Sequence, residues 1–248
     1  MEGGTTYFQG TNVLSTASTR QLGNIWNSKF GDLHAGFAPL APVFAQLPQL
    51  NDFPDQSGLS ECASRLGVIT ASGIPIKFVP ARPRPRGAAR RRHKDEHDYE
   101  LRIFKQGEIS TRSRNWHDFF NALVWMTYPA TKAALNARQI AARVPGVVRT
   151  REQDRLTMFD EGGVVTVVGE DQSVLARHII GHAIFELICG YQLPVRAIEL
   201  VIPAAELENS LEHISERPLT VDQLDQLVAK RVVNQVFQSA HSSCLITR

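Results

Sequence analysis

The stretch NWHDFFNALVWMTYPATKAALNARQIAARV, residues 115–144, decides the fold. Its first part, residues 115–126, is apolar around most of a helical circumference, which predicts a helix buried on several sides. A second helix is predicted over residues 131–144, because Pro145-Gly146 stops the pattern there. Pro129 stands between the two segments, so we expect two helices connected by a short joint that contains proline.

Working outward from this pair, the sequence predicts shorter helices and strands. The expected elements are helices at 59–66, 173–188 and 219–237, strands at 73–79 and 195–202, a hairpin of 99–104 with 109–112, and a hairpin of 156–159 with 164–168. Thr150 with Gln153, and Thr220 with Gln223, have the spacing of capping boxes. The predicted fold class is α+β: a mainly helical single domain with a small antiparallel sheet of hairpins.

The composition is that of an ordinary globular protein. Of the 248 residues, 43% are hydrophobic and 21% are charged, which excludes a disordered chain, a collagen-like repeat and a coiled-coil rod. We expect residues 21–238 to form the globular domain. Residues 1–20 are expected to be a flexible leader or tag remnant, and residues 239–248 a flexible tail.

One basic loop accounts for the excess of positive charge. The formal net charge is +2, yet residues 82–94, RPRPRGAARRRHK, hold seven Lys and Arg and no acidic residue. One hypothesis is therefore a nucleic-acid-associated protein that attracts phosphates through Arg90, Arg91 and Arg92. Against it, acidic residues follow the loop at once, and no helix-turn-helix motif is present.

The sequence also bears on the compartment. No run of 18 apolar residues exists and no secretory signal is visible, so we expect no membrane association. The three cysteines, Cys62, Cys189 and Cys244, are far apart and odd in number, which argues against a disulfide framework. A cytoplasmic location fits these features.

Polar side chains interrupt the two apolar helices. His117, Asp118 and Asn121 share one face of the first helix, where buried polar groups either find partners or line a pocket. The alternative is helix capping, with Asp118 near the positive end of the helix. Lys132 and Asn136 share a face of the second helix, and plain solvent exposure is the alternative there.

A second group of candidates follows in the last third of the chain. His178, His182 and Glu186 are four residues apart, so on a helix they form one stripe that suits either a metal ion or a satisfied core histidine beside solvated groups. Asp160 and Glu161 suit acid–base or metal chemistry, or a turn. The turn is favoured for Glu161, and Asp160 stays open.

Several blocks together resemble one protein family. The blocks are YELRIFKQGEISTR, WHDFFNALVW, TKAALNA, RLTMFDEGG and GHAIFE. They are similar to the domain-of-unknown-function family numbered 3025, a bacterial family found mainly in proteobacteria, over about residues 36–190. The positions that match the family pattern are His117, Asp118, Asn121, Lys132, Asn136, Asp154, Asp160, Glu161, His182 and Glu186. The resemblance implies no known activity. His178 lies outside the pattern, which weakens a three-ligand metal stripe, and the chain departs from the family after Gly190.

The residues support three hypotheses. The first is a hydrolase-type enzyme in which His117 and His182 act as acid and base and Asp118 and Glu186 orient them or bind a metal. Its proposed ligand is a small or anionic molecule, bound by Asn121, Lys132, Asn136 and Asp160. The second is a structural or interaction protein without chemistry, and the third is the nucleic-acid-associated protein described above. The sequence identifies no cofactor and leaves the oligomeric state open.

Overall fold

The computed structural model describes residues 25–48, 51–81, 98–190, 192–206, 220–234 and 242–247. Its centre is the predicted helix pair, α6 (Trp116–Thr127) and α7 (Pro129–Ala141). The Asn115 side chain begins α6 by accepting a hydrogen bond from the backbone N–H of Asp118 at 3.0 Å. Nearly every residue of α6 is buried, as its all-round apolar sequence predicts.

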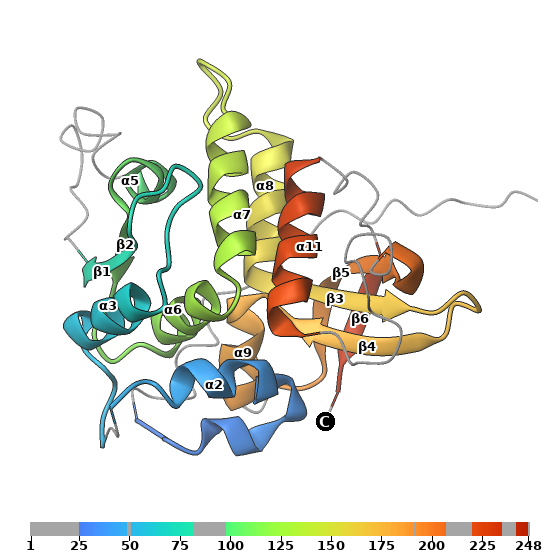
Figure 1. Cartoon of the computed structure of the whole chain (residues 1–248), viewed down its shortest axis with the longest axis horizontal. Coiled ribbons are helices and arrows are strands. Elements are labelled where there is room, and N and C mark those ends of the chain that lie inside the picture. Colours follow the sequence, from blue (N-terminus) through green and yellow to red (C-terminus); the bar gives the residue numbers. More distant parts are fainter. Residues whose placement is uncertain are drawn as a thin grey trace, which may run out of the picture.

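The second helix of this pair stands side by side with two further helices (Figure 1). The three helices are α7, α8 (Arg151–Gly162) and α11 (Val221–Val233). Both predicted capping boxes are present, that of Thr150 with Gln153 at the start of α8 and that of Thr220 with Gln223 at the start of α11. These local signals therefore set the helix starts.

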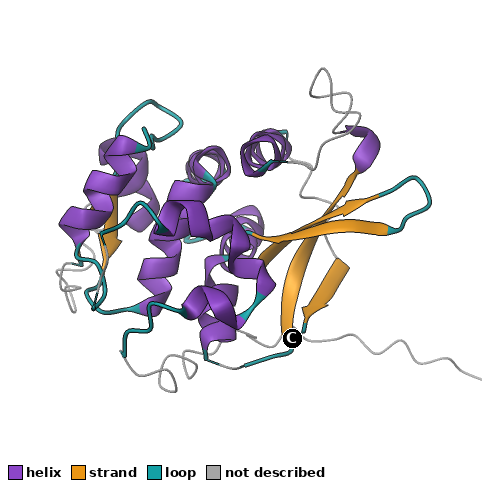
Figure 2. Ribbon diagram, turned by 60° about the horizontal axis from the view of Figure 1, so that its bottom comes forward, coloured by secondary structure: helices purple, strands orange, loops and turns teal. Residues whose placement is uncertain are grey.

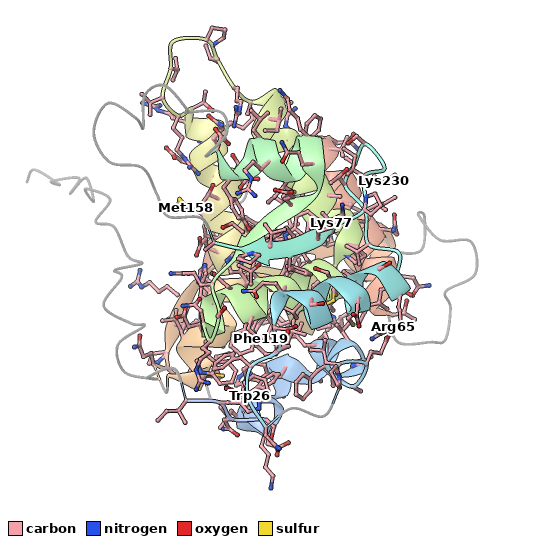
Figure 3. The ribbon with its side chains drawn as sticks, turned by 90° about the vertical axis from the view of Figure 1, so that its left-hand side faces the viewer. Trp26, Arg65, Lys77, Phe119, Met158 and Lys230 are labelled. Carbon is pink, nitrogen blue, oxygen red and sulfur yellow. The ribbon has the colours of Figure 1, made fainter. Side chains whose placement is uncertain are left out.

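The segment before α6 packs on it through aromatic rings. It contains the short helices η1 (Phe30–Leu33), η2 (Ala35–Leu40) and α2 (Ala41–Phe44), followed by α3 (Gln56–Arg65). Trp26 stacks on Trp116, and its ring centroid lies 5.3 Å from that of Phe119. Figure 3 shows Trp26 beside Phe119. This aromatic packing fixes the first turn of α6, from which His117 projects.

The strands form two sheets. β1 (Lys77–Pro80) pairs in parallel with β2 (Glu108–Thr111). The larger sheet extends from one side of the helices (Figure 2) and has the order β4-β3-β5-β6, with bounds Val174–Ile179, Gly163–Val168, Val195–Pro203 and Ser242–Ile246. β3 is parallel to β5 and antiparallel to β4, and β5 is antiparallel to β6. The α+β class is thus confirmed, but the small antiparallel sheet of hairpins is wrong.

The first predicted hairpin is absent because its first strand is a helix. α5 (Tyr99–Gln106) begins after Asp98, whose carboxylate accepts from the backbone N–H of Leu101 at 3.1 Å. It ends at Gly107, which has a left-handed φ of 69°. A short apolar pattern fits either a strand or a helix, and here the caps at both ends decide for the helix.

The second predicted hairpin and the helix over 173–188 are also wrong. Residues 156–159 belong to α8, and β3 begins directly after it at Gly163. The segment 173–188 divides into strand β4 and helix α9 (His182–Cys189). The break between them is Gly181, whose backbone N–H donates to the Gly163 carbonyl at 2.8 Å. Pairing with β3, which no local pattern encodes, thus overrides the helical spacing.

The contact of Gly181 with Gly163 also explains the architecture near the site. A Cβ on Gly181 would lie 2.4 Å from the Gly163 nitrogen and 2.5 Å from the Glu161 carbonyl oxygen. Only glycine allows so close an approach. As a result, the end of α8 and the start of α9 lie against each other.

Two further expectations concern the ends and the basic loop. Residues Ser242–Ile246, predicted as part of a flexible tail, form strand β6 on the edge of the larger sheet. Residues 1–20 and the loop 82–94, with Arg90, Arg91 and Arg92, lie outside the described residues. Among the helices that the structure does describe, none is long and apolar enough to cross a membrane.

Candidate functional site

Three helices bring ionisable side chains to one place. His117 comes from the first turn of α6, Asp160 and Glu161 from the last turn of α8, and His182 and Glu186 from α9. The glycine contact described above sets α8 against α9, and α9 packs against α6. Residues that are 65 positions apart in the chain therefore become neighbours.

The two histidine rings face each other through their Nε2 atoms. His117 Nε2 lies 3.1 Å from His182 Nε2, and the ring centroids are 4.6 Å apart. On the other side of each ring, His182 Nδ1 lies 2.8 Å from the backbone carbonyl oxygen of Asp160, and His117 Nδ1 lies 3.0 Å from Glu186 Oε2. A carbonyl oxygen only accepts, so Nδ1 of His182 carries the proton and its Nε2 presents a lone pair.

The same reasoning applies to His117. An ionised Glu186 accepts a hydrogen bond from Nδ1–H of His117. If His117 is neutral, its Nε2 also presents a lone pair, and two lone pairs meet at 3.1 Å. The arrangement therefore requires something positive between the rings: a proton on His117 or a cation.

The environment makes the two rings electrostatically unequal. Burial, together with the charges of His117 and Lys132, lowers the pKa of His182 well below its usual value. Burial also acts against protonation of His117, but the hydrogen bond that His117 donates to Glu186 and the charges of Glu161 and Glu186 raise the pKa of His117 overall. Without a cation, His117 is thus the member of the pair that holds the extra proton.

Glu161 completes the cluster. One ligand atom each from His117, Glu161 and His182 lies within 4.8 Å of the others. Burial raises the pKa of the Glu161 carboxyl, and the charge of His117 partly offsets this effect. Sequence reasoning favoured a turn for Glu161, but it lies in the last turn of α8. The available signal was its place next to Asp160 in the family-like block RLTMFDEGG.

One carboxylate oxygen of Glu186 has no partner among the residues that the structure describes. Its side chain is 8% exposed, and Oε2 contacts His117 Nδ1. The other oxygen, Oε1, is buried and has no hydrogen-bond partner within the part of the chain that the structure describes. A buried polar atom in this state calls for a partner such as a water molecule or an ion.

The predicted ligand-binding residues form a second network behind the histidines. Buried Lys132 donates to Asn121 Oδ1 at 3.0 Å and also forms an ion pair with Asp160. Asn121 in turn donates to the Tyr99 hydroxyl at 2.9 Å. These groups contact one another, so substrate binding by Asn121, Lys132 and Asp160 stays a prediction.

Three other candidates lie apart from the histidine pair. Asn136 donates to the Glu100 carboxylate at 2.7 Å. The Asp118 carboxylate accepts from Nε and Nη2 of Arg112 at 2.9 Å and 2.8 Å, so it pairs with an arginine instead of orienting a histidine. His178 lies in strand β4, which removes the predicted helical stripe of His178, His182 and Glu186.

Comparison with known proteins gives a match to a protein family. No curated protein and no solved structure matches the chain. A family model does match residues 88–178, less than half of the chain, and this segment includes His117, Asp160 and Glu161 but not His182 or Glu186. The resemblance seen in the sequence is thereby confirmed over this segment: residues 88–178 resemble the family described as "Protein of unknown function (DUF3025)".

Proposed function

We propose that the protein is a hydrolase-type enzyme that activates water at the cluster of His117, His182 and Glu161. One observation carries the proposal: two Nε2 atoms converge at 3.1 Å beside a carboxylate, and only one of the two rings reaches solvent. The His117 side chain is 25% exposed, whereas that of His182 is 5% exposed. Water therefore reaches the cluster from the side of His117.

The chemistry of hydrolysis fits these groups. Water must lose a proton as its oxygen bonds to an acyl or phosphoryl centre, and the leaving group must gain one. In the metal-free chain, the Glu161 carboxylate takes the proton from water, and protonated His117 gives its Nε2 proton to the leaving group. Transfer of the proton from Glu161 to His117 then restores both groups. Both groups lie where the two rings converge.

The buried partners hold these groups in place. Glu186 binds Nδ1 of His117, which fixes the ring and stabilises its protonated form. The Asp160 carbonyl fixes the tautomer of His182. In this proposal Lys132 and Asn121 act through Asp160, whose position they set, and not by touching the substrate.

The test is hydrolysis by the full-length chain of a panel of chromogenic carboxylic and phosphoric esters. His117→Ala and Glu161→Gln should each lower kcat/KM by at least about 100-fold, the range expected for loss of a general acid or base. His178→Ala is the matched control, because His178 lies four residues before His182 but outside the cluster, and it should keep the activity.

Two results would contradict the proposal. The first is the absence of turnover above the buffer rate on every ester. The second is equal turnover by the wild-type chain and Glu161→Gln. If the double variant His117→Ala/His182→Ala changes only the stability of the protein, the structural or interaction hypothesis gains support instead.

A further inference from the structure

We infer that His117 Nε2, His182 Nε2 and the Glu161 carboxylate bind one divalent transition-metal cation of the zinc class, with a coordination position left for water. The three ligand atoms lie within 4.8 Å of one another and come from three different helices. This inference goes beyond the proposed hydrolysis, because the cation site stands on geometry that exists whether or not a substrate is turned over.

The first argument is the spacing of the two nitrogens. Zinc binds histidine nitrogen at about 2.0–2.1 Å, so two histidine ligands of a tetrahedral ion lie about 3.3 Å apart. The two Nε2 atoms are 3.1 Å apart. A cation between the lone pairs converts their mutual repulsion into two coordinate bonds. The Glu161 carboxylate oxygen lies within 4.8 Å of the histidine ligand atoms and would act as the third ligand after a small movement toward them.

The second argument is the set of groups behind the ligands. A metal-bound histidine almost always donates its other ring N–H to a carboxylate or a backbone carbonyl. Here His117 does so to Glu186 at 3.0 Å, and His182 to the Asp160 carbonyl at 2.8 Å. Both rings thus already have the tautomer and the orientation that a metal ligand requires.

The third argument concerns the kind of metal. Two imidazoles and one carboxylate suit zinc and its neighbours, whereas calcium and magnesium prefer sites made of oxygen alone. A set of three protein ligands is the pattern of catalytic zinc sites, in which water occupies the fourth position. The partial exposure of His117 and Glu161 leaves room for that water.

Local charge also favours a cation. Glu161 and Glu186 contribute two carboxylates at the cluster. The nearby cations Lys132 and Arg112 are each paired, with Asp160 and Asp118 respectively. An excess of negative charge therefore remains next to the converging lone pairs.

The experiment measures metal binding directly. The full-length chain is stripped with a chelator, dialysed, and titrated with Zn²⁺ by calorimetry, and with Co²⁺ by its visible absorption. We expect saturable binding of one ion per chain. The Co²⁺ spectrum should show the intense bands of low coordination number with nitrogen ligands.

Variants assign the ligands. His182→Ala and Glu161→Gln should each weaken Zn²⁺ binding by more than about 10-fold, and Glu186→Gln, which alters only the partner of His117, by about 10–100-fold. His178→Ala is the matched control and should bind as the wild type does. Circular dichroism of each variant shows whether it is folded, and Glu161→Gln keeps the shape of the side chain if an alanine variant does not fold.

Some outcomes would overturn the metal site. They are the absence of saturable Zn²⁺ or Co²⁺ binding, or equal binding by the wild type and folded His182→Ala. The proposed function is tested separately. Hydrolysis by a chain that shows no saturable Zn²⁺ or Co²⁺ binding would overturn the metal site and leave the hydrolase proposal intact. Metal binding without hydrolysis of any ester would do the reverse.

Discussion

Two buried polar clusters of this protein are built in opposite ways. In the first, the Asp225 carboxylate of α11 accepts from the backbone N–H groups of Ala130 and Thr131 at the start of α7, each at 2.8 Å. The Thr131 hydroxyl donates to the Asp225 carbonyl at 3.1 Å. In the second, His117 and His182 face each other through the Nε2 atoms described above.

The difference distinguishes a cluster that stabilises the fold from the cluster that we propose to be functional. Every group of the Asp225 cluster has a partner, and it ties α11 to the N-terminus of α7, where free N–H groups would otherwise be buried. The histidine cluster brings acceptors together and leaves Glu186 Oε1 with no partner in the described part of the chain. Such an arrangement lowers stability until something positive binds, which is typical of active sites.

The comparison predicts that the Asp225 cluster matters most for stability. Asp225→Ala leaves two buried N–H groups without acceptors, so we expect the free energy of unfolding to fall by about 3–4 kcal/mol. Urea unfolding followed by circular dichroism measures this loss. Asp225→Asn keeps one acceptor oxygen and should lose about half as much. A loss below about 1 kcal/mol for Asp225→Ala would break the distinction between the clusters.

The histidine cluster is predicted to gain stability from its ligand. At a free Zn²⁺ concentration 100 times the Kd, binding to the folded state alone raises the free energy of unfolding by about 2.7 kcal/mol. A chelator should reverse the effect, and a thermal unfolding scan records both changes. In His182→Ala the metal should change nothing. Equal stabilisation of both proteins would place the ion elsewhere in the chain.

Sequence reasoning succeeded where the information is local. The α6–α7 pair follows from an apolar run and a proline, and the starts of α8 and α11 follow from capping boxes within four residues. Sequence reasoning failed where a short apolar segment fits both the helical and the strand periodicity. The sequence predicts strands at 99–104 and 156–159, but both segments are helical, because helix caps and tertiary packing favour the helix.

In the candidate site, too, local features could be predicted from the sequence and long-range contacts could not. His117, His182 and Glu186 stand out in the sequence, because each is a polar residue within an apolar helix. Their meeting could not be predicted, since it depends on contacts between residues far apart in the chain. For Glu161 the sequence favours a turn over acid–base or metal chemistry, because Gly162-Gly163 follows it, whereas in the structure Gly181 packs closely against the Gly163 backbone.

The close contact between Gly181 and Gly163 can be tested by substitution. Gly181→Ala places a Cβ 2.4 Å from the Gly163 nitrogen, so the end of α8 must move away from α9. We expect a loss of about 2 kcal/mol in the free energy of unfolding, within the range for overpacked sites, together with weaker Zn²⁺ binding. Urea unfolding and calorimetry measure the two effects.

Gly162 provides the matched control. A Cβ at Gly162 would meet no atom within 4 Å, and this residue ends α8 without a positive φ. Gly162→Ala should therefore be neutral or stabilise the protein by up to about 1 kcal/mol. If both alanine variants behave alike, close packing of the two glycines does not set the geometry of the histidine cluster.

Glu100 combines features of both clusters: its carboxylate has a hydrogen-bond partner, yet burial disfavours its charge. Burial raises the pKa of its carboxyl to about 7, and the hydrogen bond from Asn136 opposes this effect. The folded pKa is thus above the ordinary value of 4.5, so folding favours the protonated form. The protonated Glu100 carboxyl therefore makes its full contribution to the free energy of unfolding at low pH. This contribution is lost as the pH rises from about 4.5 to about 7.

Glu100→Gln should remove this pH dependence. The shift corresponds to at most about 3 kcal/mol, and partial solvent screening reduces the expected effect to about 1–2 kcal/mol. The variant should match the wild type near pH 4.5 and be more stable by that amount at pH 8, as measured by urea unfolding at both values. Because the glutamine oxygen still accepts from Asn136, the difference isolates the cost of the buried charge. A variant that is less stable than the wild type at pH 8 would show that the ionised Glu100 carboxylate stabilises the fold.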